Sequence, residues 1–280
     1  DLHPRVRRQR QMCIRDRKKI GLALGLLPNE LASAWIPVEK LRDNVWLTEN
    51  GMSSSIMGEV MVNTVAQRGD RVELKNLFPR VGTYDCWAIN WGYRYWEEKQ
   101  EREASELDGL LLKNMANPSC WWNNKSLATS VIKVEANMGN LGCDPVAFAC
   151  YSLENMKRAF ACGGTNREEK ELINKWVYRV CDKKGILYEM ILSVLRQFGG
   201  IEIQPDKLHN YAYAFCSVNK KRQEEAMDFL NRELFTIPQW LMQSELIVKA
   251  GVDPSGLIAA WQASALSLIH ISEPTRHAQI

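Results

Sequence analysis

Apolar residues recur at every third or fourth position in several separate segments of this chain, and that spacing constrains the fold more than any other feature. Leu172, Trp176 and Val180, for example, would share one face of a single helix. Apolar residues at this spacing are typical of helices that bury one face. The same pattern predicts helices at about residues 152–161, 166–182, 186–198 and 219–235, and a last one from about residue 254. The sequence therefore predicts a mainly α-helical protein.

One segment departs from the helical spacing. Residues 199–203 alternate between apolar and polar side chains, and residues 209–216 alternate aromatic with small ones. Alternation of this kind is typical of β-strands, and two such runs joined by a short polar connection predict a hairpin. We therefore expect one small β-hairpin near residues 199–217.

The first half of the chain contains fewer regular patterns. Residues 18–27 are apolar and predict the last part of a helix, which Pro28 would stop. A second helix is predicted from about Tyr84, with Asp85 placed to complement its dipole, and helical sequence continues over 97–117. The aromatic side chains of the second helix recur along one face, so we expect them in the core; they are Trp87, Trp91 and Tyr95.

Both ends of the chain resemble translated sequencing adapter rather than natural protein. Residues 11–17 match the peptide encoded by one strand of a transposon mosaic-end adapter, and residues 266–271 match the peptide encoded by the opposite strand. Such segments must be set aside before the composition is interpreted. We therefore expect residues 1–17 and 266–280 to be artefacts and residues 18–265 to be the natural segment.

This exclusion changes what the composition implies. Seven of the 36 Lys and Arg residues lie in the two adapter-like stretches, but only three of the 33 Asp and Glu residues do, so the remaining charges nearly balance. A balanced chain gives no sign of nucleic-acid binding, and no apolar run is long enough to span a membrane. Of the four histidines only His209 remains. We expect the seven remaining cysteines to be buried free thiols, with disulfide bonds possible if the protein is exported.

Residues 18–28 fit the frame of a zinc-binding motif, H-E-x-x-H-x-x-G-x-x-H, without its ligands. Gly25 stands at the glycine of that frame, whereas the three histidine positions hold Lys18, Leu22 and Pro28, and the glutamate position holds Lys19. In an intact motif the histidines bind zinc and the glutamate polarises the zinc-bound water. Aliphatic and cationic side chains cannot do this, so we expect no zinc and no intact catalytic residue in this chain.

Several further stretches occur in the order and spacing of one enzyme family. They include Ser55-Ile56-Met57, the run Val65-Ala66-Gln67 with Asp70 behind it, and the segment from Tyr84 to Arg94. Together with residues 18–28 they resemble a bacterial, exported, metzincin-like family of zinc-dependent metalloproteases. The resemblance implies that Met57 is the Met-turn methionine beneath the metal site, and that Gly25 keeps the backbone shape there. It also implies zinc as the cofactor of the family.

The resemblance also implies a fold and a division into domains. Residues 18–117 would form the lower subdomain of a metzincin-like fold, with the remnant of the zinc helix, the Met-turn and the tryptophan-rich helix. Residues 118–265 would form a helical C-terminal region that contains the hairpin. The upper sheet subdomain would be missing from this chain. Without it, we expect the leucines of residues 18–27 to be exposed: Leu22, Leu24, Leu26 and Leu27.

Three hypotheses about function follow. The first is a catalytically inactive pseudopeptidase that binds a protein or peptide, or the missing N-terminal domains of its own protein. The second is an active zinc metalloprotease whose motif is corrupted at the adapter junction before Lys18. The third is an unrelated helical interaction module. By family resemblance the protein would be exported to the periplasm or cell envelope, and we expect neither nucleic-acid binding nor a membrane span.

Overall fold

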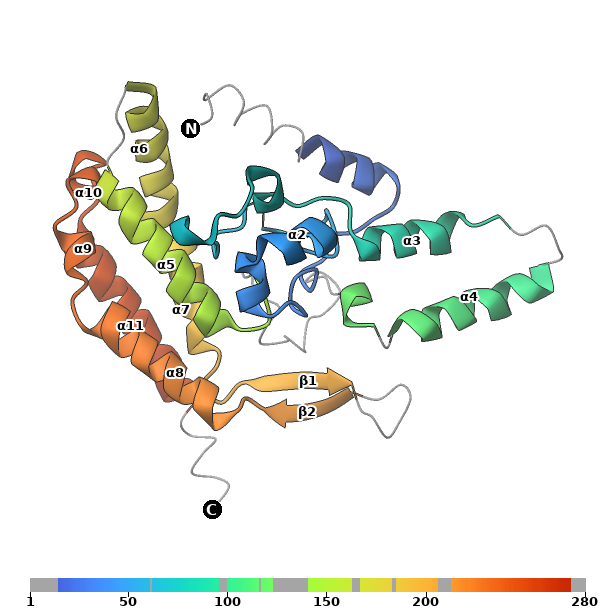
Figure 1. Ribbon diagram of the computed structural model, residues 1–280. Coiled ribbons are helices and arrows are strands. Elements are labelled where there is room, and N and C mark those ends of the chain that lie inside the picture. The colour runs from blue at the N-terminus through green and yellow to red at the C-terminus, as the bar shows by residue number, and fades with distance from the viewer. Residues whose placement is uncertain are drawn as a thin grey trace, which may run out of the picture. The chain divides into compact units, whose positions relative to one another are not determined.

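The computed structural model describes residues 15–60, 62–95, 100–115, 117–122, 141–162, 167–182, 185–205 and 213–272. By packing, the chain divides into two compact units, Asp1–Asp144 and Pro145–Ile280 (Figure 1). The short described stretches near the end of the first unit belong to it, because Asn29 Nδ2 donates to Trp121 O and Cys143 N donates to Ile36 O. The family-based division at residue 118 stays a prediction.

The first unit consists of short helices joined by irregular chain. A helix over residues 15–23 comes first. It is followed by the 3-10 helix η1 (Val38–Arg42), α2 (Asn44–Asn50), the 3-10 helices η2 (Arg68–Asp70) and η3 (Leu74–Leu77), α3 (Thr83–Tyr93), α4 (Gln100–Met115) and the 3-10 helix η4 (Pro118–Cys120). The first helix ends four residues before the predicted residue 27. Gly25 adopts a φ of +81°, a left-handed conformation that commonly ends helices.

A buried cluster and one ion pair stabilise the middle of this unit. Ile36, Leu41 and Leu47 are fully buried around η1 and α2. Beside them Arg42 donates twice to Asp70, from Nε to Oδ2 and from Nη2 to Oδ1, each over 2.7 Å. This two-point geometry is the strongest that an arginine and a carboxylate can form, and it joins η1 to η2.

The second unit is a bundle of helices around α7. Its elements are α5 (Pro145–Cys162), α6 (Arg167–Cys181), α7 (Ile186–Leu195), the strands β1 (Ile201–Pro205) and β2 (Tyr213–Ser217), α8 (Lys220–Leu230), the π-helix η5 (Asn231–Phe235), α9 (Gln239–Met242), α10 (Glu245–Lys249) and α11 (Pro254–Ser272). Helices α5, α6, α8 and α11 all pack against α7. Six of its ten residues are buried, as expected of a helix that is apolar on nearly every side.

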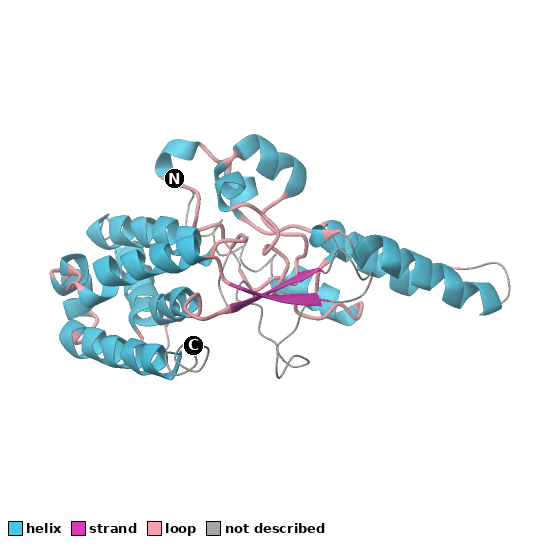
Figure 2. Cartoon of the chain, turned by 90° about the horizontal axis from the view of Figure 1, so that it is seen from below, coloured by secondary structure: helices cyan, strands magenta, loops and turns pink. Residues whose placement is uncertain are grey.

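The strands form the predicted hairpin (Figure 2). They are antiparallel, with Ile201 opposite Ser217 and Pro205 opposite Tyr213. The residues that join them, including His209, lie outside the described part of the chain. The prediction of a mainly helical protein with one small hairpin is thus confirmed. No helix in the described ranges has the length and apolar character needed to cross a bilayer.

Three expectations about burial are wrong in part. Trp91 is 42% exposed, because only the first turn of α3 is fully buried, and Tyr95 is 84% exposed because α3 ends at Tyr93 and leaves it outside the helix. Leu26 was expected to be exposed with its neighbours, but it is buried against Ile56 and Met57. The cysteines were expected to be buried, yet among those whose burial the structure describes only Cys181 is fully buried, and Cys86 and Cys162 are exposed.

Candidate functional site

The candidate site is built around a tight turn over residues 55–58. Gly58 N donates to Ser55 O over 3.3 Å, which closes the turn, and Met57 N donates to Ser55 Oγ over 3.0 Å. All four residues of this turn are buried. Since buried polar groups must find partners inside the protein, the serine hydroxyl accepts from Met57 N, two positions further on, and this bond fixes the conformation of the turn.

Asp85, in the first turn of α3, anchors this turn. Its Oδ1 accepts a 2.6 Å hydrogen bond from Ser55 Oγ, and its Oδ2 accepts from Ile56 N over 2.7 Å and from Gly82 N over 3.0 Å. The side chain is 2% exposed. A buried carboxylate with three donors is well satisfied, and hydrogen bonds to a charged group are among the stronger ones in proteins. Asp85 therefore does more than complement the helix dipole: it holds the turn against α3.

Met57 lies directly beneath the helix of residues 15–23. It is buried together with Ile56 and Leu26, and the partly buried Ala88 and Ile89 of α3 pack against the same cluster. Gly21 faces the methionine so closely that a β-carbon added there would lie 2.6 Å from Met57 Sδ. A side chain at residue 21 would therefore have to displace the methionine side chain or the helix.

The backbone just after this helix is also tied to the turn. Asn29 is fully buried, and its backbone N donates to Met57 O over 3.3 Å. Its side chain accepts a hydrogen bond from Leu31 N and donates one to Trp121 O. Gly25, which the sequence analysis singled out for backbone shape, takes the left-handed conformation that allows the chain to turn back towards Met57.

Lys18 reaches over the turn from the helix. Its Nζ donates to Gly58 O over 2.5 Å, so the cationic group at the first histidine position of the frame is bonded within the protein. Burial lowers the pKa of Lys18 because it removes water from the ammonium group, while the nearby carboxylate of Glu59 acts in the opposite direction. The structure therefore brings Lys18 and Met57 together at one turn.

The other positions of the zinc-motif frame bring no metal-binding atoms to the Met57 turn. Lys19 is exposed and lies 3.9 Å from Asp16, and Leu22 and Pro28 are exposed as well. An ammonium engaged with a carbonyl, a second ammonium, an isobutyl group and a proline ring do not fit a zinc ion, which takes nitrogen, sulfur or carboxylate ligands. Among the residues that the structure describes, no three His, Cys, Asp or Glu side chains gather as a metal site would require. That the chain binds no zinc stays a prediction.

The family resemblance singles out Lys18, Gly21, Gly25 and Met57, but the sequence does not reveal the contact of Gly21 with Met57 or the anchoring role of Asp85. A contact at Gly21 could have been suspected, because a glycine inside an apolar helix often has a packing reason. The signal for Asp85 was weaker. Its partners Ser55 and Ile56 lie 30 and 29 residues away in the sequence, and no periodic pattern connects them.

The Met-zincin family matches residues 17–280. Neither the curated proteins nor the solved structures contained a match to the chain. The family match covers nearly the whole chain, including the helix of residues 15–23, the turn at Met57 and the helical second unit.

Proposed function

Because this chain belongs to the Met-zincin family, we propose that it is a pseudopeptidase, a relative of zinc metallopeptidases that binds a protein or peptide without cleaving it. The hydrogen bond from Lys18 Nζ to Gly58 O carries this proposal. A zinc peptidase needs a metal with an open position for water and a general base beside it. At the Met57 turn of this chain, the ammonium group of Lys18 provides the positive charge that a zinc ion would provide in a peptidase.

The Met57 turn supports the idea that the scaffold is retained while the chemistry is lost. We propose that Met57 serves as the Met-turn methionine of the family and that Gly25 keeps the backbone shape around it. The buried hydrogen bonds of Asp85 and the close approach of Gly21 hold this region together without any metal. A family member that no longer uses zinc needs such internal bonds, since metal binding otherwise contributes to the stability of its site.

An apolar surface beside the turn supports a binding role. Leu22, Leu24 and Leu27 are 52%, 42% and 47% exposed. Tyr93 of α3 is also exposed, and its hydroxyl donates to Leu24 O over 3.1 Å, so the end of α3 adjoins these leucines. Exposed apolar side chains that gather in one place are typical of interaction surfaces. We propose that a protein or peptide segment binds there.

Fluorescently labelled casein tests both parts of the proposal. Casein is an unfolded substrate of many peptidases, so an apolar binding surface should retain it. We expect the labelled casein to bind, as measured by fluorescence anisotropy, and to stay intact on a gel with or without added zinc. Cleavage that a chelator abolishes would contradict the loss of activity. Failure to bind would contradict the binding role.

Two matched variants locate the binding. Leu24→Glu places a charge in the apolar surface and should weaken casein binding, because burying that carboxylate is costly. Val248→Glu, at an exposed position of the second unit, should leave the binding unchanged. Equal effects of the two variants would mean that the surface around Leu24 is not the binding site.

A second candidate is an active zinc peptidase whose motif is altered next to the adapter-like stretch. It is favoured by the position of Lys18 immediately after residue 17, where that stretch ends. It explains Lys18 and Lys19 better than Leu22 and Pro28, which lie further inside. Resequencing the gene decides between the two: histidine codons at positions 18, 22 and 28 would support the active enzyme. We also propose, from the family resemblance, that the protein is exported, and a signal peptide encoded by the same gene would support this.

A further inference from the structure

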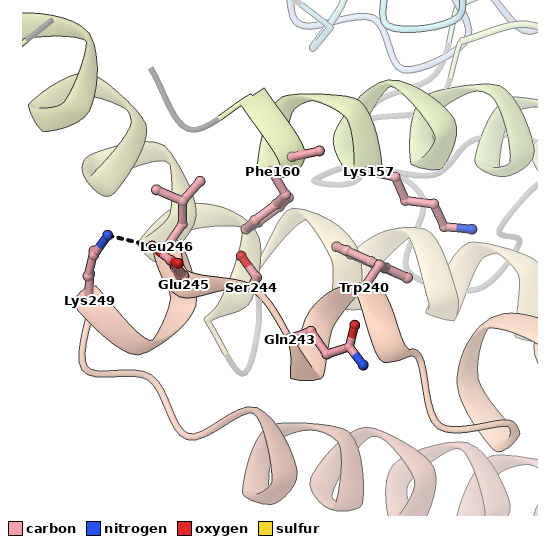
Figure 3. Close-up of a pocket in the computed structure, with 9 residues that line it drawn as sticks. Lys157, Phe160, Trp240, Gln243, Ser244, Glu245, Leu246 and Lys249 are labelled. Atoms are coloured by element: carbon pink, nitrogen blue, oxygen red, sulfur yellow. Dashed lines mark hydrogen bonds and ion pairs between the residues drawn. The ribbon is translucent and has the colours of Figure 1, made fainter. Parts of the chain in front are cut away.

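The second unit contains a cavity of about 500 Å³ between α5 and the segment of α9 and α10 (Figure 3). Pockets of this size are typical of sites for small ligands. It lies wholly within the unit Pro145–Ile280, and it involves none of the residues around Met57. Its ligand is therefore a separate question from the proposed function.

Two aromatic rings form one wall of this cavity. Phe160 of α5 and Trp240 of α9 meet edge to face, with ring centroids 5.5 Å apart and an angle of 61° between the planes. Leu246 of α10 adds an apolar side chain to the lining. Aromatic walls favour a flat ring, which can pack against them face to face or edge to face.

Two polar atoms in the same lining have no hydrogen-bond partner among the described residues. They are Ser244 Oγ and Trp240 Nε1, and both are shielded from solvent. Ser244 precedes α10 at the position where a serine usually caps the helix, yet its side chain makes no capping bond. In Figure 3 its hydroxyl points towards the ring of Phe160. A buried hydroxyl without a partner is costly. Ser244 Oγ is closed to solvent, so a ligand oxygen reaches it when the serine side chain turns from Phe160 into the cavity, and the bond formed there satisfies the hydroxyl.

The charges of the lining favour a neutral ligand. Lys157 pairs with Glu233 over 2.9 Å, and Lys249 pairs with Glu245 over 2.8 Å. Both ammonium groups in the wall thus already have a carboxylate beside them, so a carboxylate or phosphate ligand would have to compete for them. An uncharged oxygen has no such competitor at Ser244.

We propose that this cavity binds a phenol-like group, a flat aromatic ring that carries one neutral oxygen, with the ring against Phe160 and Trp240 and the oxygen bonded to Ser244. The group could be a free phenolic compound or the tyrosine side chain of a peptide. These two sources share the same chemistry at the cavity, and the experiment separates them.

Binding is measured on the whole chain by ligand-detected NMR titration with p-cresol, which is the side chain of tyrosine, and with toluene, which lacks the oxygen. We expect p-cresol to bind more tightly than toluene. Ser244→Ala should weaken p-cresol binding about fivefold, the ratio that one hydrogen bond contributes, and should leave toluene binding unchanged. Equal binding of the two compounds by the unaltered protein, or no binding of p-cresol, would overturn the proposal.

A second pair of variants shows that the ligand is in this cavity. Ala161 is an exposed residue at its edge, and Ala161→Phe should block p-cresol without disturbing the core. Ala259→Phe, at an exposed position of α11, should have no effect. If Ala161→Phe binds p-cresol as well as the unaltered protein, while circular dichroism shows both to be folded, the proposal is wrong.

The tripeptide Gly-Tyr-Gly distinguishes the two sources. If it competes with p-cresol, the cavity accepts a tyrosine side chain within a peptide. If p-cresol binds but the tripeptide does not compete, the cavity takes a free phenol. Both results support the phenol-like ligand, and the Ser244→Ala variant must weaken whichever compound binds.

Discussion

Gly21 and Met57 are in such close contact that a β-carbon on the glycine would lie 2.6 Å from the methionine sulfur. Real β-carbons do not approach other atoms to that distance, so any side chain at position 21 must displace the methionine or the helix. The contact places the helix of residues 15–23 directly on the turn over residues 55–58. This packing, together with the hydrogen bonds of Asp85 and Lys18, forms the candidate site.

Gly21→Ala should destabilise the protein. In a helix interior without such a contact, replacing glycine by alanine gains about 1 kcal/mol, whereas overpacking costs about 1–3 kcal/mol. We therefore expect a lower free energy of unfolding in urea for Gly21→Ala. Gly109→Ala in α4, where the added carbon meets nothing within 4 Å, should instead be stabilising. If both variants gained stability, the helix would not rest on Met57.

Asp85→Asn should destabilise the first unit by about 2 kcal/mol, because hydrogen bonds to a charged group are worth about 1.5–3 kcal/mol each. The amide keeps the shape of the carboxylate but cannot accept from both Ser55 Oγ and Ile56 N. Urea unfolding measures the loss. Asp108→Asn, at an exposed position of α4, is the matched control and should change the stability little. Equal stabilities of the two variants would show that Asp85 does not anchor the turn.

Leu26 and Leu27 are neighbours in sequence that should respond differently to truncation. Leu26 is 8% exposed and packs on Met57, whereas Leu27 is 47% exposed. Leu26→Ala should therefore cost about 2–5 kcal/mol, the usual range for a buried leucine, and Leu27→Ala much less. Thermal unfolding of the two variants checks this. A larger loss of stability for Leu27→Ala than for Leu26→Ala would mean that Leu27, and not Leu26, packs on Met57.

The buried thiol of Cys181 should make the folded protein less stable at alkaline pH than at neutral pH. Burial raises the pKa of its thiol from 9.0 to about 12. Between these values the unfolded chain releases the thiol proton while the folded chain keeps it, so the free energy of unfolding falls as the pH rises from about 9 to about 12. Cys181→Ala should flatten this dependence in urea titrations at several pH values. Cys162→Ala, an exposed cysteine, should leave it unchanged; a similar slope for all three proteins would refute the assignment to Cys181.

Three helices of the second unit follow closely from the sequence. α6, α7 and α8 begin near their predicted positions, because amphipathic spacing and the glycines and prolines between segments are local signals. The hairpin was predictable for the same reason. α5 begins at Pro145, ahead of the predicted residue 152, and the short helices α9 and α10 were not predicted. By contrast, the sequence predicts that Trp91 and Tyr95 share a helix face, whereas α3 ends at Tyr93 and Tyr95 lies outside it. The sequence also does not say whether another segment covers Trp91. The exposure of these two side chains could not be predicted from α3 alone.

The candidate site was predictable in its residues more than in its geometry. The family pattern identified Lys18, Gly25 and Met57 and the absence of histidines at positions 22 and 28. It could not reveal that Lys18 reaches Gly58 O, which is 40 positions away, or that Leu26 packs inwards while Leu24 and Leu27 do not. These details depend on how the chain turns after Gly25, and they become visible only when distant segments are placed together.

The zinc content of the purified protein is the sharpest test of whether this chain has lost its metal site. The protein is expressed with zinc in the medium and dialysed against metal-free buffer. Its metal content is then measured by inductively coupled plasma mass spectrometry. The frame of residues 18–28 offers two ammonium groups, a leucine and a proline in place of zinc ligands, so we expect no zinc above the buffer blank. One zinc ion bound per chain would contradict this expectation.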